Sequence, residues 1–179
     1  VDSPAAQQIR RLLWAMERPS AANRVRAVAL GWFFGYSAAQ VATMVDSDGD
    51  GTTNDALAVI QDALRDDAEI LRRRGVAELA HHLRCRARVR TNDTTADTSP
   101  DAIDGPSTLG TRLLTTPGGE RHLTDLAHLW ELLSERTKAQ GTSPSSVLEV
   151  LVESPDPEAE ATEVLQRRTE ADGGAVTVM

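Results

Sequence analysis

The stretch GGERHLTDLAHLWELLSE, residues 118–135, carries the clearest helical pattern in the chain. Its apolar residues recur every three or four positions, which places them on one face of an α-helix. That face consists of Leu123, Leu126, Leu129, Trp130 and Leu133. The pair Gly118-Gly119 is typical of a turn that ends one element, with Glu120 opening the next helix. We therefore expect a long amphipathic helix that ends near Gly141.

The same period and its capping signals extend through most of the chain. The predicted helix starts are Ser3-Pro4, Ser20, the capping box Ser37 with Gln40, Ser143-Pro144 and Asp156-Pro157. Four apolar faces are expected. The helix from Ser3-Pro4 has Ile9, Leu12, Leu13 and Met16, the helix from Ser20 has Val25, Val28, Ala29 and Trp32, a long helix after the acidic loop has Leu57, Ile60, Leu64 and Leu71, and the helix that follows it has Val76, Leu79, Ala80 and Leu83. Pro19 and Gly75 are expected to end helices. The sequence predicts an all-α fold, an irregular subdomain of about eight or nine helices.

The two ends of the chain suggest where it comes from. The last residues, AVTVM, predict a short strand, and a lone strand would have unpaired edges. We therefore expect the chain to be a piece of a larger protein. The N-terminal VDSPAAQQIRR does not resemble a secretory signal, and no run of about 18 apolar residues could span a membrane. A single cysteine, Cys85, fits the reducing cytoplasm, where we expect the protein to act.

Charge and polarity are unevenly distributed. The formal net charge of −8 argues against general nucleic-acid affinity. Residues 71–90 nevertheless contain seven arginines and one glutamate. Residues 91–108, TNDTTADTSPDAIDGPST, are small, polar and interrupted by proline and glycine, which predicts a flexible surface loop.

The acidic segment at residues 46–57 resembles a calcium-binding loop. Asp46, Asp48 and Asp50 stand at the first, third and fifth positions of an EF-hand and are followed by the expected glycine. The twelfth position, where a bidentate glutamate completes the coordination, is Leu57. Leu57 also opens the apolar face of the next helix. We expect a solvated turn and no metal site, with a calcium-responsive helical protein as an alternative.

The sequence contains no recognisable catalytic constellation. It has no G-x-x-x-x-G-K-[ST] phosphate loop, no G-x-S-x-G elbow and no H-E-x-x-H motif. His81 and Cys85 share a helical face beside His82, but structural zinc requires four ligands and no second pair stands at suitable spacing. We therefore expect neither catalysis nor a bound cofactor in this chain.

The arginine segment at residues 71–90 is the strongest electrostatic feature. Guanidinium groups suit phosphate oxygens, and such contacts position a protein on DNA without reading its sequence. Alternatively, Arg72, Arg73 and Arg74 pair with the preceding acidic helix, for example with Glu69. Both interpretations remain open at the level of the sequence.

Four segments resemble, in the same order, RecB-type subunits of the RecBCD helicase–nuclease (exodeoxyribonuclease V), which are UvrD-like superfamily-1 helicases. These segments are LLWAMERPSAANRVRAVALGWFFGYSAAQVATM, LRRRGVAELAHHL, GGERHLTDLAHLWELLSE and LQRRTEADGGAVTVM. The resemblance covers nearly the whole chain, and its last two segments are the specific ones. His122 stands where the family usually has arginine, and residues 91–108 look like an insertion.

The resemblance implies an accessory helical subdomain, termed 2B, inserted in a motor domain. Residues 1–20 would lead out of the second motor domain, residues 21–168 would form the subdomain, and residues 169–179 would return to the motor domain with its terminal strand. ATP and Mg²⁺ are implied only for the parent enzyme, because its ATP-binding and nuclease motifs lie elsewhere. The implied role is to position duplex DNA near a fork in double-strand break repair and recombination, together with RecC-like and RecD-like subunits.

The resemblance also indicates where DNA would be contacted. Related helicases touch the duplex through a short glycine-containing element, which corresponds most closely to FFGYSAAQ, residues 33–40. Glycine lets the backbone approach phosphate, and the start of a helix offers free N–H groups. The predicted DNA-binding residues are Arg24, Arg26, Gly35, Tyr36, Ser37, Arg72, Arg73 and Arg121. The alternatives are a plain turn that packs its aromatic residues, and a protein-interaction module that docks a RecC-like partner through apolar surface without DNA contact.

Overall fold

The computed structural model describes residues 3–42, 44, 55–86, 108–138 and 142–153. Within these residues the fold consists of eight helices: α1 (Pro4–Glu17), α2 (Ala22–Ala29), α3 (Ala38–Ala42), α4 (Asp55–Arg74), α5 (Val76–Cys85), α6 (Leu109–Leu114), α7 (Gly119–Thr137) and α8 (Pro144–Glu153). The predicted all-α fold is confirmed for this part of the chain. The expected terminal strand, the helix at Asp156-Pro157 and the polar loop up to residue 107 lie outside the described residues.

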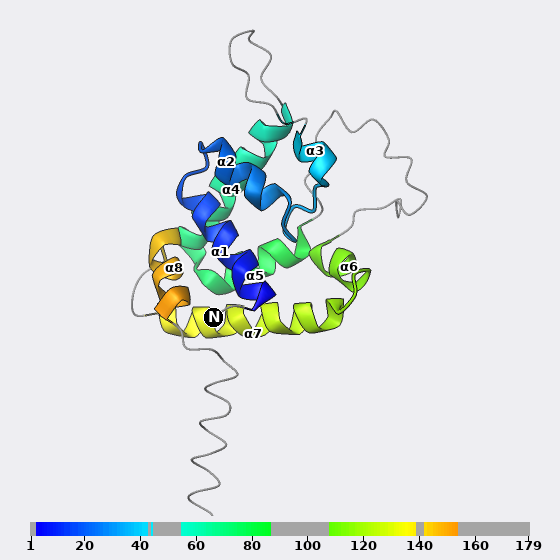
Figure 1. Ribbon diagram of the computed structural model, residues 1–179. Helices are drawn as coiled ribbons and strands as arrows, with labels where there is room; N and C mark the ends of the chain where they lie inside the picture. Colours follow the sequence, from blue (N-terminus) through cyan, green and yellow to red (C-terminus); the bar gives the residue numbers. More distant parts are fainter. Residues whose placement is uncertain (1–2, 43, 45–54, 87–107, 139–141, 154–179) are drawn as a thin grey trace, which may run out of the picture.

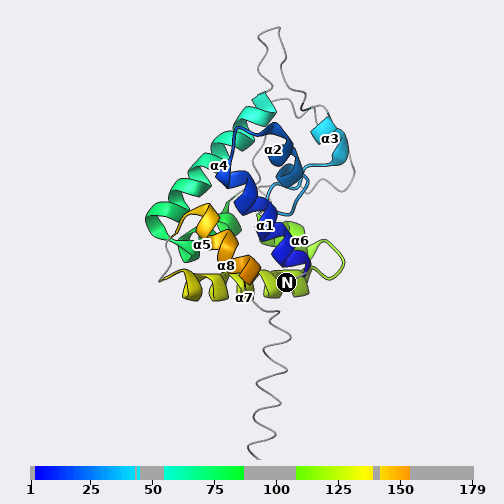
Figure 2. The same ribbon diagram turned by 60° about the vertical axis from the view of Figure 1, so that its left-hand side comes forward.

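Helix α7 lies along the base of the molecule in both views (Figures 1 and 2). Helices α1, α5, α6 and α8 all pack against it. Its buried face contains Leu126, Leu129, Trp130 and Leu133, as the sequence pattern predicts. Helix α7 is therefore the platform on which four other helices rest.

Helix α1 occupies the middle of the fold and contacts α2, α4, α7 and α8. Its predicted apolar face is buried: Ile9, Leu12 and Leu13 expose nothing and Met16 only 2%. Full burial of a side chain of this size contributes about 1.5–3 kcal/mol to stability. Helix α1 therefore supplies a large part of the single hydrophobic core.

Two of the predicted caps are observed directly. The Ser3 hydroxyl accepts a hydrogen bond from the Ala6 N–H at 3.2 Å and caps α1. At α3, the Ser37 hydroxyl accepts from the Gln40 N–H at 3.2 Å, and the side-chain carbonyl of Gln40 accepts from the Ser37 N–H at 2.9 Å. The predicted capping box is confirmed.

The predicted cap at Ser20 is wrong. Helix α2 begins one residue later, with Ala21 at the cap position and no side-chain hydrogen bond there. The turn after α1 is closed instead by the backbone, because the Ala21 N–H donates to the Arg18 carbonyl at 3.0 Å. A backbone turn thus takes the place of the hydroxyl cap.

Helix α6 is an element that the sequence pattern does not indicate. It has six residues, too few to show a helical period, and it buries only Leu109 and Leu113. The Thr108 hydroxyl caps it by accepting from the Thr111 N–H at 3.3 Å. Thr108 is the last residue of the expected polar loop, so that loop ends in a helix cap.

The glycine pair before α7 forms the predicted turn, and each glycine has its own reason. Gly118 has a φ of 73°, a left-handed conformation that glycine adopts without strain. At Gly119 any Cβ atom would overlap the backbone carbonyl of Leu113. Helix α6 therefore sits directly on the first turn of α7 because residue 119 has no side chain.

No described helix is long and apolar enough to cross a membrane. The division of the chain into residues 1–20, 21–168 and 169–179 remains a prediction.

Candidate nucleic-acid interface

The corner between α4 and α5 presents three consecutive arginines to solvent. Ile60, Leu64 and Leu71 hold α4 to the core with no exposed surface. Gly75 then turns the chain into α5 with a φ of 85°. The side chains at the end of α4 are left outside, with exposed fractions of 53% for Arg72, 77% for Arg73 and 69% for Arg74. These three residues are termed the arginine corner.

Each guanidinium of the arginine corner pairs with a glutamate three or four residues away in the sequence. Arg72 Nη1 lies 2.6 Å from Glu69 Oε2, and Arg73 Nε contacts the other oxygen of Glu69. Arg74 Nη1 lies 3.2 Å from Glu78 Oε1. The pairing with the preceding acidic helix, which the sequence leaves open as an alternative, is therefore present for Arg72 and Arg73, whereas Arg74 pairs with α5. Exposed pairs of this kind contribute about 0–1 kcal/mol, so a phosphate could displace the carboxylates at little cost.

The backbone of the arginine corner is held from outside α4. The Thr142 hydroxyl, in the segment before α8, donates to the Arg72 carbonyl at 3.2 Å. The methyl group of Thr142 also lies beside Gly75. The segment before α8 therefore contacts the backbone of the arginine corner, while the three guanidinium groups face solvent.

The two predicted arginines of α2 make contacts inside the fold. Arg24 Nη1 donates to the Trp14 carbonyl at 2.8 Å and pairs with Glu17 at 3.0 Å, while its guanidinium lies 4.2 Å from the centre of the Trp14 ring. Arg26 donates through Nε and Nη2 to the Met44 carbonyl at 2.9 and 2.7 Å. Both guanidinium groups therefore connect α2 to neighbouring segments.

The turn at residues 33–40 is well ordered by local contacts. Gly35 has a φ of 68°, and Tyr36 is buried with its N–H donating to the Ala29 carbonyl at 2.9 Å. Ser37 is exposed and takes part in the capping box of α3. The DNA-binding roles predicted for these three residues remain predictions.

Arg112 is a residue of this region that sequence reasoning misses. Its Nη2 donates to the carbonyls of Trp32 at 2.9 Å and Phe33 at 3.1 Å, and the side chain lies against Gly35. These contacts connect α6 to the turn at residues 33–40. No signal in the sequence points to them, because 80 residues separate Arg112 from Trp32.

The predicted DNA-binding residues do not form one surface. Arg121 is exposed near the start of α7, whereas the arginine corner packs near the end of α7 through Thr142. The rise of a helix places these two ends of α7 about 24 Å apart. Trp32, which precedes the turn at residues 33–40, stacks on His122 at 4.6 Å and so belongs to the Arg121 end.

A charged cluster lies between α4 and α5, behind the arginine corner. Asp67 is fully buried, and Arg86 Nη1 donates to both of its carboxylate oxygens at 2.8 Å. His82 Nε2 lies 3.6 Å from Asp67, and the Arg86 guanidinium also stacks over Phe34 at 5.0 Å. Burial raises the pKa of the Asp67 carboxyl above its usual range, although the charge and hydrogen bonds of Arg86 oppose the shift.

The described residues contain no group of three or more His, Cys, Asp or Glu side chains arranged to hold a metal ion. Asp46, Asp48 and Asp50 lie outside this part of the chain. Leu57, at the twelfth loop position, is buried in the core, as its place on the apolar face of α4 predicts. The Cys85 sulfur lies 3.9 Å from His81 Nε2, and both side chains are exposed.

Known proteins with similar sequences support the family resemblance. The chain is 29% identical over 177 residues to the RecBCD enzyme subunit RecB of Mycolicibacterium smegmatis. It is 32% identical over 133 residues to the RecBCD enzyme subunit RecB from two strains of Mycobacterium tuberculosis. The resemblance to RecB is confirmed. No family model matches the chain.

The similarity to RecB covers 99% of this chain but 14% of the M. smegmatis subunit, and 74% of this chain but 10% of the M. tuberculosis subunits. The chain thus spans about a seventh of the length of the M. smegmatis RecB. Because almost no residue falls outside that match, each described helix has a counterpart region in RecB.

Proposed function

We propose that this chain is a non-catalytic accessory region of a RecB-like subunit, corresponding to the 2B subdomain, and that it holds duplex DNA by its phosphates. The arginine corner carries this proposal. It presents three solvated guanidinium groups at the end of α4, in a chain that is similar in sequence to RecB over 99% of its own length. Such a surface grips DNA without regard to sequence, as a helicase requires of the duplex that it unwinds.

Phosphate binding at the arginine corner proceeds by exchange of partners. In the free protein Glu69 bridges Arg72 and Arg73, which keeps two positive side chains close together despite their repulsion. A phosphate has more acceptor oxygens than a carboxylate and can accept two parallel hydrogen bonds from one guanidinium, so it replaces the carboxylate. Glu69 then limits the affinity, and a moderate affinity suits a DNA that has to slide.

The proposal assigns the chemistry to other parts of the parent protein. The relatives are named as subunits of the RecBCD enzyme. By that similarity the parent would be an ATP-dependent helicase and exodeoxyribonuclease V subunit, active in double-strand break repair and recombination, with RecC-like and RecD-like partners. ATP and Mg²⁺ would bind to its motor domains and not to this helical region.

Docking of a partner subunit is the second candidate function. In the part of the chain that the structure describes, four large apolar side chains are exposed, with fractions of 39% for Trp14, 50% for Leu30, 57% for Leu114 and 63% for Val152. They belong to α1, the end of α2, α6 and α8. A RecC-like partner that covers them would contact this region without help from the arginine corner.

The test is fluorescence anisotropy of a labelled duplex with a single-stranded tail, titrated with the protein at low and physiological salt. We expect binding that weakens steeply with salt, and Arg72→Ala/Arg73→Ala should lower the slope of log affinity against log salt by about 0.9 for each phosphate that the protein no longer neutralises. Arg65→Ala is the matched control, because Arg65 is exposed on the same helix two turns away and pairs with Asp62. An equal loss in the control, or no binding at low salt, would refute DNA holding by the arginine corner and favour partner docking.

A further inference from the structure

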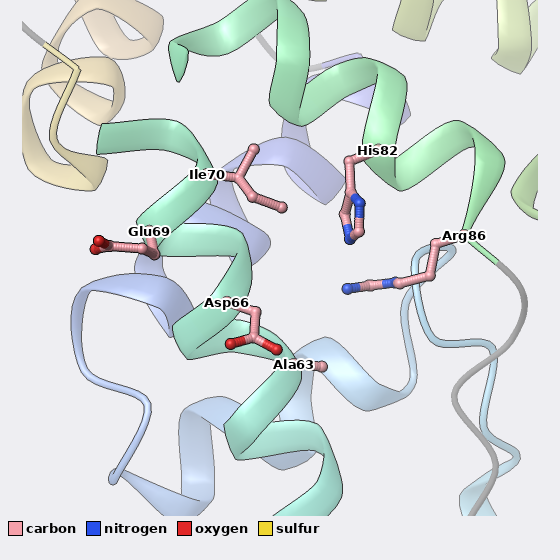
Figure 3. Close-up of a pocket in the computed structure, with 6 residues that line it drawn as sticks. All are labelled: Ala63, Asp66, Glu69, Ile70, His82 and Arg86. Carbon is pink, nitrogen blue, oxygen red and sulfur yellow. The ribbon is translucent and has the colours of Figure 1, made fainter. Parts of the chain in front are cut away.

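A pocket opens between α4 and α5, next to the arginine corner (Figure 3). Its volume is about 470 Å³, within the range of about 300–1,000 Å³ that is usual for small-ligand sites. The residues that line it are Ala63, Asp66, Glu69, Ile70, His82 and Arg86. Of these residues, Glu69 also takes part in the contacts proposed above, through its pairs with Arg72 and Arg73.

The inner wall of the pocket carries an unused hydrogen-bond donor. Asp67 engages one nitrogen of Arg86, since both of its bonds come from Nη1. Arg86 Nη2 is buried and has no hydrogen-bond partner among the described residues. A buried donor left unpaired costs about 1–3 kcal/mol, which an acceptor atom of a ligand would recover. Asp67 thus positions the guanidinium of Arg86 and leaves Nη2 of Arg86 available to a ligand.

The opposite wall supplies an acceptor and an apolar surface. Figure 3 shows the tip of Arg86 pointing across the gap toward α4, where Asp66 and Ile70 stand. The Glu69 carboxylate points away from the gap, consistent with its pairing to the arginine corner. A ligand in the pocket would therefore meet a donor from Arg86, a carboxylate from Asp66 and the aliphatic side chain of Ile70.

This combination matches a nucleobase. The flat face of a base can pack on Ile70, a ring carbonyl can accept from Arg86, and N–H groups beside that carbonyl can donate to Asp66. Guanine suits the pocket best, because its edge carries a carbonyl next to two N–H groups that a carboxylate accepts together.

The pocket and the arginine corner lie on the same face of α4. Ala63, Asp66 and Ile70 follow a helical spacing whose next member is Arg73. Arg73 stands about 5 Å further along the helix axis than Ile70, roughly the distance between a base and its own phosphate. We propose that the α4–α5 pocket takes one unpaired base, preferably guanine, of a strand whose phosphate lies on Arg73. This inference rests on the proposed phosphate contacts.

The test compares labelled single strands that differ in their bases and share all phosphates. One strand is abasic at every position, and the others carry a single central guanine or adenine. We expect the guanine strand to bind about tenfold more tightly than the abasic strand, as a stacked and hydrogen-bonded base does in other proteins. Adenine, which has no carbonyl, should give a smaller gain.

Two isosteric variants locate the effect. Asp66→Asn should reduce the guanine gain at least threefold, whereas Asp62→Asn, an exposed carboxylate one turn earlier on α4, should leave it unchanged. Both variants remove one negative charge, so electrostatics alone predicts equal tightening in the two. Circular dichroism confirms that each variant folds.

The outcomes separate the two proposals. Salt-dependent binding that is equal for abasic and guanine strands overturns the base pocket and leaves phosphate holding intact. A guanine gain that survives Asp66→Asn also overturns the pocket. No binding of any single strand at low salt overturns the base pocket, and the duplex titration described above then decides phosphate holding separately.

Discussion

The arginines of α2 and those of the arginine corner look alike in the sequence but do opposite things in the structure. Arg24 and Arg26 direct their donors to the backbone carbonyls of Trp14 and Met44. Arg72 and Arg73 pair with the exposed carboxylate of Glu69, and more than half of each side chain remains in water. The first pair stabilises the fold, whereas the second is available to a ligand.

The difference depends on what lies within reach of each side chain. Helix α2 is short and runs beside α1 and the segment that contains Met44, so its arginines meet carbonyls that lack helical partners. The arginine corner lies at the end of a long helix between Leu71 and Val76, which are both buried, and its own side chains face solvent. Arginine density in the sequence therefore does not tell which guanidinium groups stay exposed; the backbone carbonyls within reach of each side chain do.

Arg86→Met should have the largest effect on stability. It removes both hydrogen bonds that Arg86 gives to the buried Asp67 carboxylate and leaves it, among the described residues, only His82 at 3.6 Å. Removing one partner of a buried pair typically costs 3–5 kcal/mol, so we expect a loss of about that size. Urea denaturation measures it. Arg84→Met, at an exposed position near the end of α5, serves as the control and should change stability by less than about 0.5 kcal/mol. Equal effects at the two positions would show that burial of the pair is unimportant.

Arg26→Ala sharpens the comparison between the two arginine groups. It leaves the Met44 carbonyl without its two donors, and we expect a loss of about 1–3 kcal/mol. Arg73→Ala should cost less than about 0.5 kcal/mol, because its pair with Glu69 is exposed. Thermal or urea unfolding of the two variants side by side decides the matter. A larger loss for Arg73→Ala would reverse the assignment of fold and surface roles.

A smaller effect should appear in the pH dependence of stability. Because the pKa of Asp67 is raised in the folded chain above its ordinary value of 3.8, protonation of Asp67 favours folding. This contribution is complete below the unfolded pKa and is lost as the pH rises through the folded pKa. An asparagine at this position does not titrate. The Asp67→Asn variant should therefore become more stable relative to the natural chain as the pH rises through the folded pKa of Asp67. Urea midpoints at a series of pH values measure the difference, and a constant difference would contradict a raised pKa.

Much of the fold follows from patterns in the sequence. The buried faces of α1, α4, α5 and α7 can be predicted because each helix is long enough for its apolar residues to repeat. The capping box of α3 and the turn at Gly118-Gly119 were readable because they are local. Helix α6 was not, since six residues show no period and its place depends on contact with α7.

The candidate site was only partly readable. The exposure of the arginine corner and its link to Glu69 follow from helical spacing. The contacts of Arg26 with Met44, of Arg112 with Trp32 and of Arg86 with Asp67 join residues 18, 80 and 19 positions apart. Such distances carry no periodic signal, so the residues that build the α4–α5 pocket emerge only once the helices are packed.

The two adjacent glycines before α7 answer to different constraints on substitution. Gly118 must adopt a left-handed backbone conformation, so asparagine or a D-amino acid at this position would lower stability only modestly. At Gly119 the requirement is empty volume beside the Leu113 carbonyl, which the Cβ atom of any other L-residue would occupy. A change at the first position could be tolerated alone, whereas a change at the second would require α6 to be rebuilt at the same time.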